Sequence, residues 1–311
     1  MTHQQRTRAP NGKRRARAKP LMPMDQEILR FLWKWKLSTA LVLYFSVGKL
    51  GSRRAFNKRL TKLEENGVIE MNYDYCNRGR KLWELTSLGF QQIKSTLPEL
   101  KDTGIKSPSL DHDFTCLAFI LGEWAFEKCP LPEIITDQEL LRIDDSERPD
   151  WLPAPRDHRA DGFIRVCVDG EEKVFAFEAE LNVKRSWRYE VAIWDYRHQR
   201  RTTRVIWLYR DPYFLTQFLK AKAERKDETA NYHVFVDEAD FLENGWEAAV
   251  YNEKSVKLLT LRKLLRGNEG VDPGETAGKG GRNLRIKIFS DRKKYLDLKP
   301  TCEFTKEDLF L

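Results

Sequence analysis

The chain has 311 residues, with 55 lysines and arginines against 47 aspartates and glutamates, for a formal net charge of +8. No run of about 18 apolar residues is present, which excludes a membrane-spanning helix, and the basic N-terminus lacks the apolar run of a secretory signal. The five cysteines form no CxxC pair, so the sequence predicts a cytoplasmic protein with reduced, packing cysteines and no zinc.

The excess positive charge lies at the N-terminus. The first twenty residues contain no acid and seven basic residues: Arg6, Arg8, Lys13, Arg14, Arg15, Arg17 and Lys19. Removing these seven from the 55 leaves 48 basic against 47 acidic residues, a nearly neutral body. Residues 1–22 are therefore predicted to be a disordered basic arm that contacts DNA phosphates without reading sequence.

Residues 23–97 are predicted to form a winged-helix DNA-binding domain. Helical periodicity begins near Met24, a second helix is expected over 40–47, and Ser52 is expected to cap a third helix that ends near Glu65. Two short strands, over 68–75 and 81–86, and a closing helix over 87–96 follow. The order helix–helix–helix–strand–turn–strand is typical of a winged helix.

The third predicted helix has two distinct faces. At 100° per residue, Phe56, Leu60 and Leu63 share the face expected to enter the core. We expect the opposite face to enter a DNA major groove, and it carries Arg54, Asn57, Lys58, Thr61 and Lys62. Arg78 and Arg80, in the turn between the strands, are expected to contact phosphate or the minor groove. The alternative is a winged helix that binds protein.

After a linker over residues 98–109, residues 110–266 are predicted to form an α/β domain with a mixed sheet. Its expected elements are a helix over 113–128, a hairpin of strands 160–168 and 173–181, a helix over 183–198, a strand over 204–209, a helix over 213–225 and a strand over 232–236. Residues 237–240 are expected to be a loop. A flexible glycine-rich loop over 267–282 and a C-terminal segment over 283–311 complete the chain.

Three carboxylates are expected to gather on the predicted hairpin. Alternation places Glu178 and Glu180 on one face of a buried strand, and Asp161 lies on the partner strand. Because buried carboxylates repel one another, they need a cation, and oxygen-only ligands suit Mg²⁺ or Mn²⁺. Lys184 could orient an attacking water, and Arg188 could hold a phosphate.

Other interpretations of these residues remain open. Glu178 and Glu180 could instead pair with basic residues of the helix over 184–201. His112 and Asp113 could join the site, although a helix-capping role for His112 is favoured, and Glu123 could supply a further carboxylate. Two tyrosines of the same basic helix, Tyr189 and Tyr196, are expected to be core or phosphate contacts more than nucleophiles.

Asp161-Gly162, the segment 175–181 with Glu178-Ala179-Glu180, and the helical Lys184, Arg188 and Tyr196 together resemble the PD-(D/E)xK nuclease fold. With the preceding winged helix, residues 24–240 resemble the plasmid replication–relaxation family, which includes the MOB-C mobilisation relaxases. The resemblance implies metal-dependent nicking at a plasmid origin, with Asp161, Glu178 and Glu180 at the acidic positions and Lys184 at the basic one. Ala160 replaces the usual proline, and Glu180 stands where lysine is usual.

The sequence therefore predicts a metal-dependent DNA endonuclease or nickase of a plasmid or other mobile element. Double-stranded DNA of the origin region is the expected partner, with other relaxosome proteins as further candidates. The alternative function is a non-catalytic replication or transcription regulator, or a relaxosome accessory protein, with a degenerate nuclease fold.

Overall fold

The computed structural model describes residues 21–48, 51–72, 81–126, 132–154, 157–227 and 232–267. The basic arm up to residue 20, Arg78, Arg80, the glycine-rich segment after residue 267 and the C-terminal segment lie outside the described residues. Within the described ranges, no helix combines the length and the apolar composition that crossing a bilayer requires.

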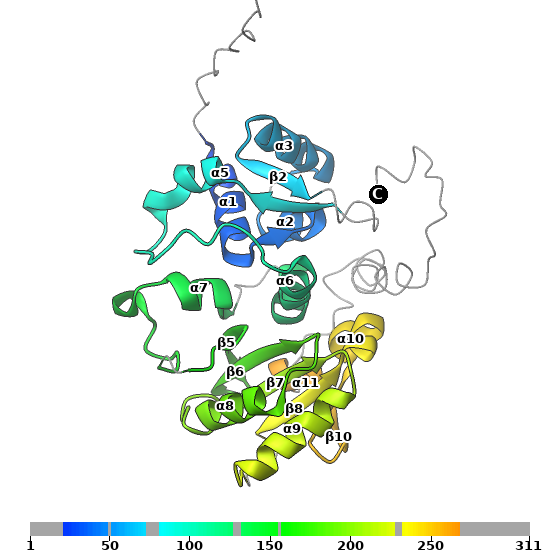
Figure 1. Cartoon of the computed structure of the whole chain (residues 1–311). Coiled ribbons are helices and arrows are strands. Elements are labelled where there is room, and N and C mark those ends of the chain that lie inside the picture. Colours follow the sequence, from blue (N-terminus) through cyan, green and yellow to red (C-terminus); the bar gives the residue numbers. More distant parts are fainter. Residues whose placement is uncertain are drawn as a thin grey trace, which may run out of the picture.

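The N-terminal unit combines helices with a small sheet (Figure 1). Its elements are α1 (Pro23–Trp35), β1 (Leu37–Ser38), α2 (Ala40–Ser46), α3 (Arg53–Glu65), β2 (Ile69–Asn72), β3 (Leu82–Leu85) and α5 (Ser87–Ile93). The strands form an antiparallel sheet in the order β1-β3-β2. Ser52 caps α3 as predicted, because its side chain accepts a hydrogen bond from the Ala55 N–H.

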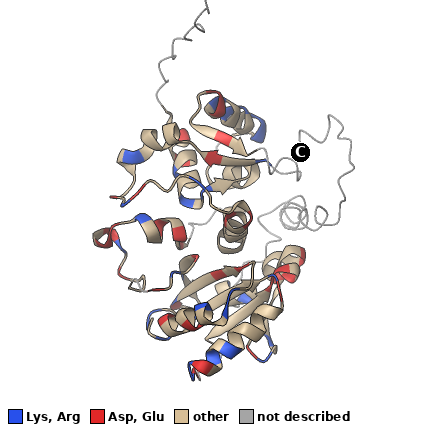
Figure 2. Ribbon diagram, viewed as in Figure 1, with Lys and Arg blue, Asp and Glu red and all other residues tan. Residues whose placement is uncertain are grey.

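The two faces of α3 are as predicted. Phe56, Leu60 and Leu63 are buried in the core of the N-terminal unit. The opposite face is exposed at Arg54, Asn57, Lys58, Thr61 and Lys62. Figure 2 shows lysines and arginines, in blue, along this helix. The side chains predicted to contact DNA are thus accessible to a ligand.

The rest of the described chain builds a seven-stranded mixed sheet in the order β10-β9-β8-β7-β6-β5-β4. Its strands are β4 (Glu133–Thr136), β5 (Gly162–Val168), β6 (Glu171–Glu180), β7 (Arg204–Tyr209), β8 (His233–Asp237), β9 (Ala249–Tyr251) and β10 (Lys257–Thr260). Strands β4, β5 and β6 pair antiparallel, whereas β6, β7 and β8 run parallel. The predicted mixed α/β class is confirmed.

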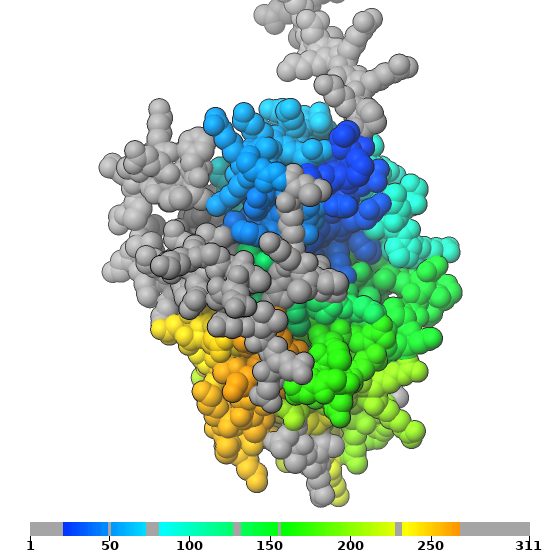
Figure 3. Space-filling view, turned by 180° about the vertical axis from the view of Figure 1, so that it is seen from behind, coloured from blue at the N-terminus to red at the C-terminus, as the bar shows by residue number. Residues whose placement is uncertain are grey.

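Helices cover both faces of this sheet. They are α6 (Leu110–Cys116), α7 (Asp137–Arg142), α8 (Ser186–Arg197), α9 (Tyr213–Glu224), α10 (Glu238–Asn244) and α11 (Leu261–Arg266). Residues of α8 and α9 pack on one face, in a core that includes Tyr196 and Trp207. The other face packs on α6, α10 and α11 and also reaches Trp35 and Leu37 of the N-terminal unit. One core cluster therefore extends from the sheet into the N-terminal unit, which also has a core of its own, and α6 and α7 lie between the two parts (Figures 1 and 3).

Several sequence predictions for this region were wrong. Residues 237–240 are not a loop, because Asp237 accepts hydrogen bonds from the N–H groups of Ala239 and Asp240 and caps α10. The helix expected over 113–128 begins earlier, with Ser109 as its cap, and its regular part ends at Cys116. It continues as a π turn and then, from Gly122, as a 3₁₀ turn. His112 lies inside the first turn and is therefore not the cap.

The segment predicted as a linker, over 98–109, is packed against the protein. The Trp33 indole N–H donates to the Thr103 carbonyl at 3.0 Å, and Leu100 forms a β-bridge with Ile143. The segment thus joins the N-terminal unit to the α7 region.

We expect Gly89→Ala to destabilise the N-terminal unit. A Cβ at Gly89 would lie 2.0 Å from the Val68 carbonyl oxygen and 2.8 Å from Leu85 Cδ1, so the backbone of α5 would have to shift. Overpacking of this kind costs about 1–3 kcal/mol. Urea unfolding should show the loss, whereas Gln91→Ala, on the exposed face of the same helix, should change stability by no more than about 0.5 kcal/mol. Equal stability of the two variants would contradict the packing described here.

Candidate functional site

Asp161 lies just before the start of β5 and is hydrogen-bonded to β6. Its backbone N–H donates to the Phe177 carbonyl at 3.0 Å, and its Oδ2 accepts the Ala179 N–H at 2.7 Å. Burial raises the pKa of Asp161, but the hydrogen bond and charge of His112 and the Ala179 N–H outweigh it and hold the pKa below its usual range. Asp161 is therefore a fixed, ionised carboxylate.

Glu178 is buried, with 5% of its surface exposed, near the carboxyl end of β6. Its Oε1 lies 2.6 Å from His158 Nε2 and also accepts a hydrogen bond from the Tyr196 hydroxyl of α8. Burial lowers the pKa of His158, but the charge and hydrogen bond of Glu178 outweigh it and raise the pKa above its ordinary value. His158 and Tyr196 together orient the Glu178 carboxylate.

Glu180 follows on the same face of β6 and is 3% exposed. Its Oε2 accepts a hydrogen bond from Lys184 Nζ at 2.8 Å. Its Oε1 is buried and makes no hydrogen bond of ordinary geometry with the described residues, although the Tyr189 hydroxyl is close enough to interact with this carboxylate. Burial raises the pKa of Glu180 above its usual value, Lys184 opposes this rise, and the charges of Glu178 and Asp161 add to it. Glu180 is therefore influenced by the charges of both carboxylates that the sequence analysis grouped with it.

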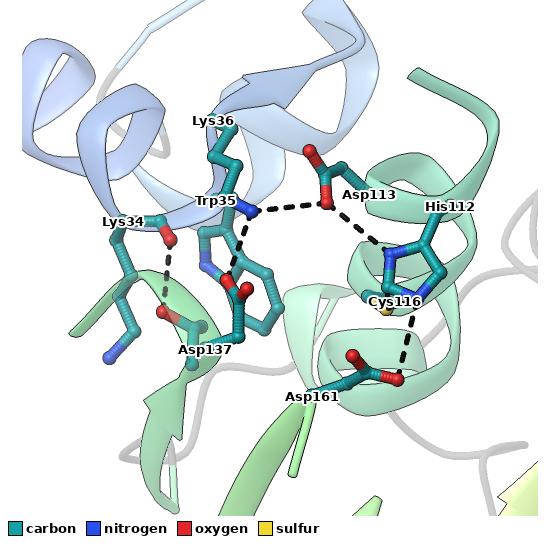
Figure 4. A pocket seen from close by; sticks show the side chains of 9 residues that line it. Lys34, Trp35, Lys36, His112, Asp113, Cys116, Asp137 and Asp161 are labelled. Atoms are coloured by element: carbon teal, nitrogen blue, oxygen red, sulfur yellow. Dashed lines mark hydrogen bonds and ion pairs between the residues drawn. The ribbon is translucent and has the colours of Figure 1, made fainter. Parts of the chain in front are cut away.

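On the other side of Asp161 lies α6 with His112 and Cys116 (Figure 4). His112 Nε2 is 3.4 Å from Asp161 Oδ2, and its Nδ1 is 3.5 Å from Asp113 Oδ1. Asp113 in turn accepts hydrogen bonds from Lys36 Nζ at 3.2 Å and Ser107 Oγ at 2.6 Å. These contacts link Asp161 to Lys36 in the N-terminal unit.

The same residues line a small pocket between the N-terminal unit and the sheet. Its walls come from α1, α6, the β4–α7 junction and the residue before β5. The lining residues are Lys34, Trp35, Lys36, His112, Asp113, Cys116, Thr136, Asp137 and Asp161.

Burial raises the pKa of the Cys116 thiol to about 12. Burial also lowers the pKa of His112, but hydrogen bonds to Asp113 and Asp161 outweigh this and raise the pKa well above its ordinary value.

The remaining predicted site residues lie elsewhere. Arg188 is exposed on α8, with its guanidinium carbon 5.5 Å from the centre of the Trp187 ring. Glu123 does not join the carboxylates, because it pairs with Arg262 at 2.6 Å. Tyr189 and Tyr196 are 2% and 0% exposed, which agrees with their predicted place in the core.

The sequence analysis missed one histidine of the site and preferred a different role for another. His158 was given no role, and His112 was favoured as a cap, yet both contact the predicted carboxylates. The only local signal was the position of His112 and Cys116 four residues apart, on one face of a helix.

Chemically, the arrangement offers carboxylate oxygen ligands beside a lysine ammonium group. Such a set can bind a divalent cation and place positive charge next to a phosphodiester. Comparisons of the chain with protein-family models, with curated proteins and with solved structures found no match. Any assignment of function therefore depends on the residues themselves.

Proposed function

We propose that the protein is a DNA-binding, metal-dependent endonuclease or nickase acting at a plasmid or mobile-element origin. In this proposal the N-terminal unit works as a winged helix, and the sheet carries a PD-(D/E)xK nuclease-like site. The observation that supports it best is the meeting of Asp161, Glu178 and Glu180 with Lys184 at one end of β6. Buried carboxylates in such a group destabilise the fold unless cations or hydrogen bonds compensate them, and groups of this kind are concentrated at functional sites.

The residues fit Mg²⁺ or Mn²⁺. The donors are carboxylate oxygens, and Glu180 Oε1 is buried without an ordinary hydrogen bond among the described residues. Asp161, Glu178 and Glu180 would hold the ion. When bound, such an ion supplies a water of lowered pKa and neutralises charge on a phosphoryl oxygen.

The neighbouring side chains would organise this site. His158 and Tyr196 hold the Glu178 carboxylate, and the Ala179 N–H holds that of Asp161. Burial lowers the pKa of Lys184, but the charge and hydrogen bond of Glu180 outweigh it and raise the pKa above its usual value, so the ammonium stays charged. Lys184 can then stabilise negative charge that develops on the scissile phosphate.

The exposed face of α3 would supply the DNA contact. Arg54, Lys58 and Lys62 can bind phosphate or guanine, while Asn57 and Thr61 can hydrogen-bond to base edges. Because α3 is fixed through Phe56, Leu60 and Leu63, its polar face is presented on a rigid support.

A nicking assay tests the proposal. Wild-type protein is incubated with supercoiled plasmid carrying the DNA that flanks its own gene, with and without Mg²⁺ or Mn²⁺. We expect Asp161→Asn and Glu180→Gln to lower the nicking rate by about 100-fold or more and to leave DNA affinity nearly unchanged. Glu171→Gln is the matched control, because Glu171 lies at the exposed opposite end of β6 and should nick like the wild type.

The competing function is a DNA-binding regulator or relaxosome accessory protein without catalysis. It is favoured by the ion pairs that already occupy the carboxylates, Glu180 with Lys184 and Glu178 with His158. A specific footprint on the same DNA without any nicked product, under every metal tested, would support the regulator and refute the nuclease.

A further inference from the structure

We propose that His112, Cys116 and Asp161 form a binding site for a divalent transition metal ion of the zinc class. The site shares Asp161 with the proposed nuclease centre but is otherwise separate from it, since it uses nitrogen and sulfur ligands from α6. The inference does not depend on nuclease activity.

The distances suit a tetrahedral ion. One ligand atom from each residue lies within 4.8 Å of the other two. Zinc bonds of about 2.0–2.3 Å at tetrahedral angles place neighbouring ligand atoms roughly 3.3–3.7 Å apart. The separation between His112 Nε2 and Asp161 Oδ2 is 3.4 Å, whereas Cys116 Sγ lies 3.9 Å from Nε2 and 3.7 Å from Nδ1, beside the imidazole ring. Binding through Nε2 therefore requires the thiol or the imidazole to rotate until Sγ faces Nε2.

The backbone explains why these ligands converge. His112 and Cys116 are four residues apart on α6, so they lie one above the other on one helix face. That face meets the bend before β5, where Asp161 is held by the Ala179 N–H at 2.7 Å. Two ligands are thus set by helix geometry and the third by the sheet.

An outer shell orients the histidine. Asp113 Oδ1 is 3.5 Å from His112 Nδ1, which leaves Nε2 directed toward Asp161 (Figure 4). Asp113 is itself held by Lys36 and Ser107. A metal-binding histidine whose second nitrogen donates to a carboxylate is a general feature of protein metal sites.

The ligand types select the class of metal. Thiolate and imidazole favour zinc-class ions over Mg²⁺, which requires oxygen ligands. The adjoining pocket leaves room for a water as the fourth ligand. Three protein ligands with one open position are typical of zinc sites at which chemistry occurs.

Metal binding to the full chain, with any affinity tag removed, tests this proposal. Co²⁺ is the spectroscopic probe and Zn²⁺ is titrated by calorimetry. We expect one Co²⁺ to bind with a thiolate-to-metal charge-transfer band. Cys116→Ser should abolish that band, and His112→Gln should weaken Zn²⁺ binding strongly. Asp113→Asn should weaken it by about 10–100-fold, as loss of an outer-shell partner does.

Cys167→Ser is the matched control, because Cys167 is an exposed free cysteine on β5 and should leave the spectrum unchanged. Circular dichroism of Cys116→Ser checks that the variant is folded. Absence of a thiolate band in the wild type, or its persistence in folded Cys116→Ser, would overturn the proposal. Because the experiment measures metal binding and not nicking, it can support the metal site even if the protein does not nick DNA.

Discussion

Replacing Lys36 with methionine is expected to lower the free energy of unfolding by about 3–5 kcal/mol, the usual cost of removing one partner from a buried ion pair. The Lys36 ammonium lies 3.2 Å from Asp113 Oδ1 and 3.0 Å from Asp137 Oδ1, and the Lys36 and Asp113 side chains are only 8% and 7% exposed. Methionine keeps the volume of the side chain but removes the ammonium group that both carboxylates share. Urea denaturation of the full chain measures the loss.

Lys36 occupies a position at which glycine is usually favoured. It is the C-cap residue of α1, with φ +65 and ψ −38, a sparsely populated backbone conformation that costs a non-glycine residue about 1–3 kcal/mol. Glycine would adopt this conformation more easily, but it could not reach Asp113 on α6 and Asp137 on α7. Lys36 therefore ties the N-terminal unit to two helices beside the sheet, and through Asp113 and His112 it connects to Asp161.

Two comparisons make the result specific. Lys101→Met removes an exposed pair with Asp145, in which the side chains are 50% and 66% exposed, and should cost no more than about 1 kcal/mol. Adding Asp113→Asn and Asp137→Asn to Lys36→Met should recover much of the lost stability, because the uncompensated charges are then gone. A cost for Lys36→Met as small as that for Lys101→Met would show that the buried network contributes little.

Local patterns were sufficient to predict many of the elements. The strand over 204–209 coincides with β7, and α3 begins directly after Ser52 as its capping side chain predicts. These segments have strong β-forming or amphipathic patterns that tertiary contacts reinforce. By contrast, β4 is only four residues long and lies in an acidic stretch with prolines, so its pairing with β5 has no local signal.

The candidate site was likewise predictable only where local sequence patterns determine it. Alternation along one strand placed Glu178 and Glu180 together, and the hairpin brought Asp161 beside them. His158 was missed, and His112 was favoured as a helix cap, because they approach from a loop and from α6, across contacts between residues far apart in sequence. Similarly, no pattern in the local sequence predicts that Lys36 is buried between Asp113 and Asp137.

On the proposed DNA-binding function, deletion of residues 1–20 is expected to weaken binding to all DNA sequences alike. Each basic side chain that neutralises a phosphate adds about 0.9 to the slope of log affinity against log salt. Loss of seven basic residues should therefore reduce that slope by up to about 6, which corresponds to several orders of magnitude in affinity at low salt.

Asn57→Ala is the complementary variant, because Asn57 lies on the exposed face of α3 and carries no charge. It should reduce the difference in binding free energy between specific and non-specific DNA by about 1–3 kcal/mol. The slope of log affinity against log salt should stay unchanged, as expected for a contact to a base edge. Fluorescence anisotropy over a range of KCl concentrations, with origin-region and unrelated duplexes, separates the two effects. If the deletion removes site preference and Asn57→Ala does not, the arm reads sequence and α3 is not the recognition helix.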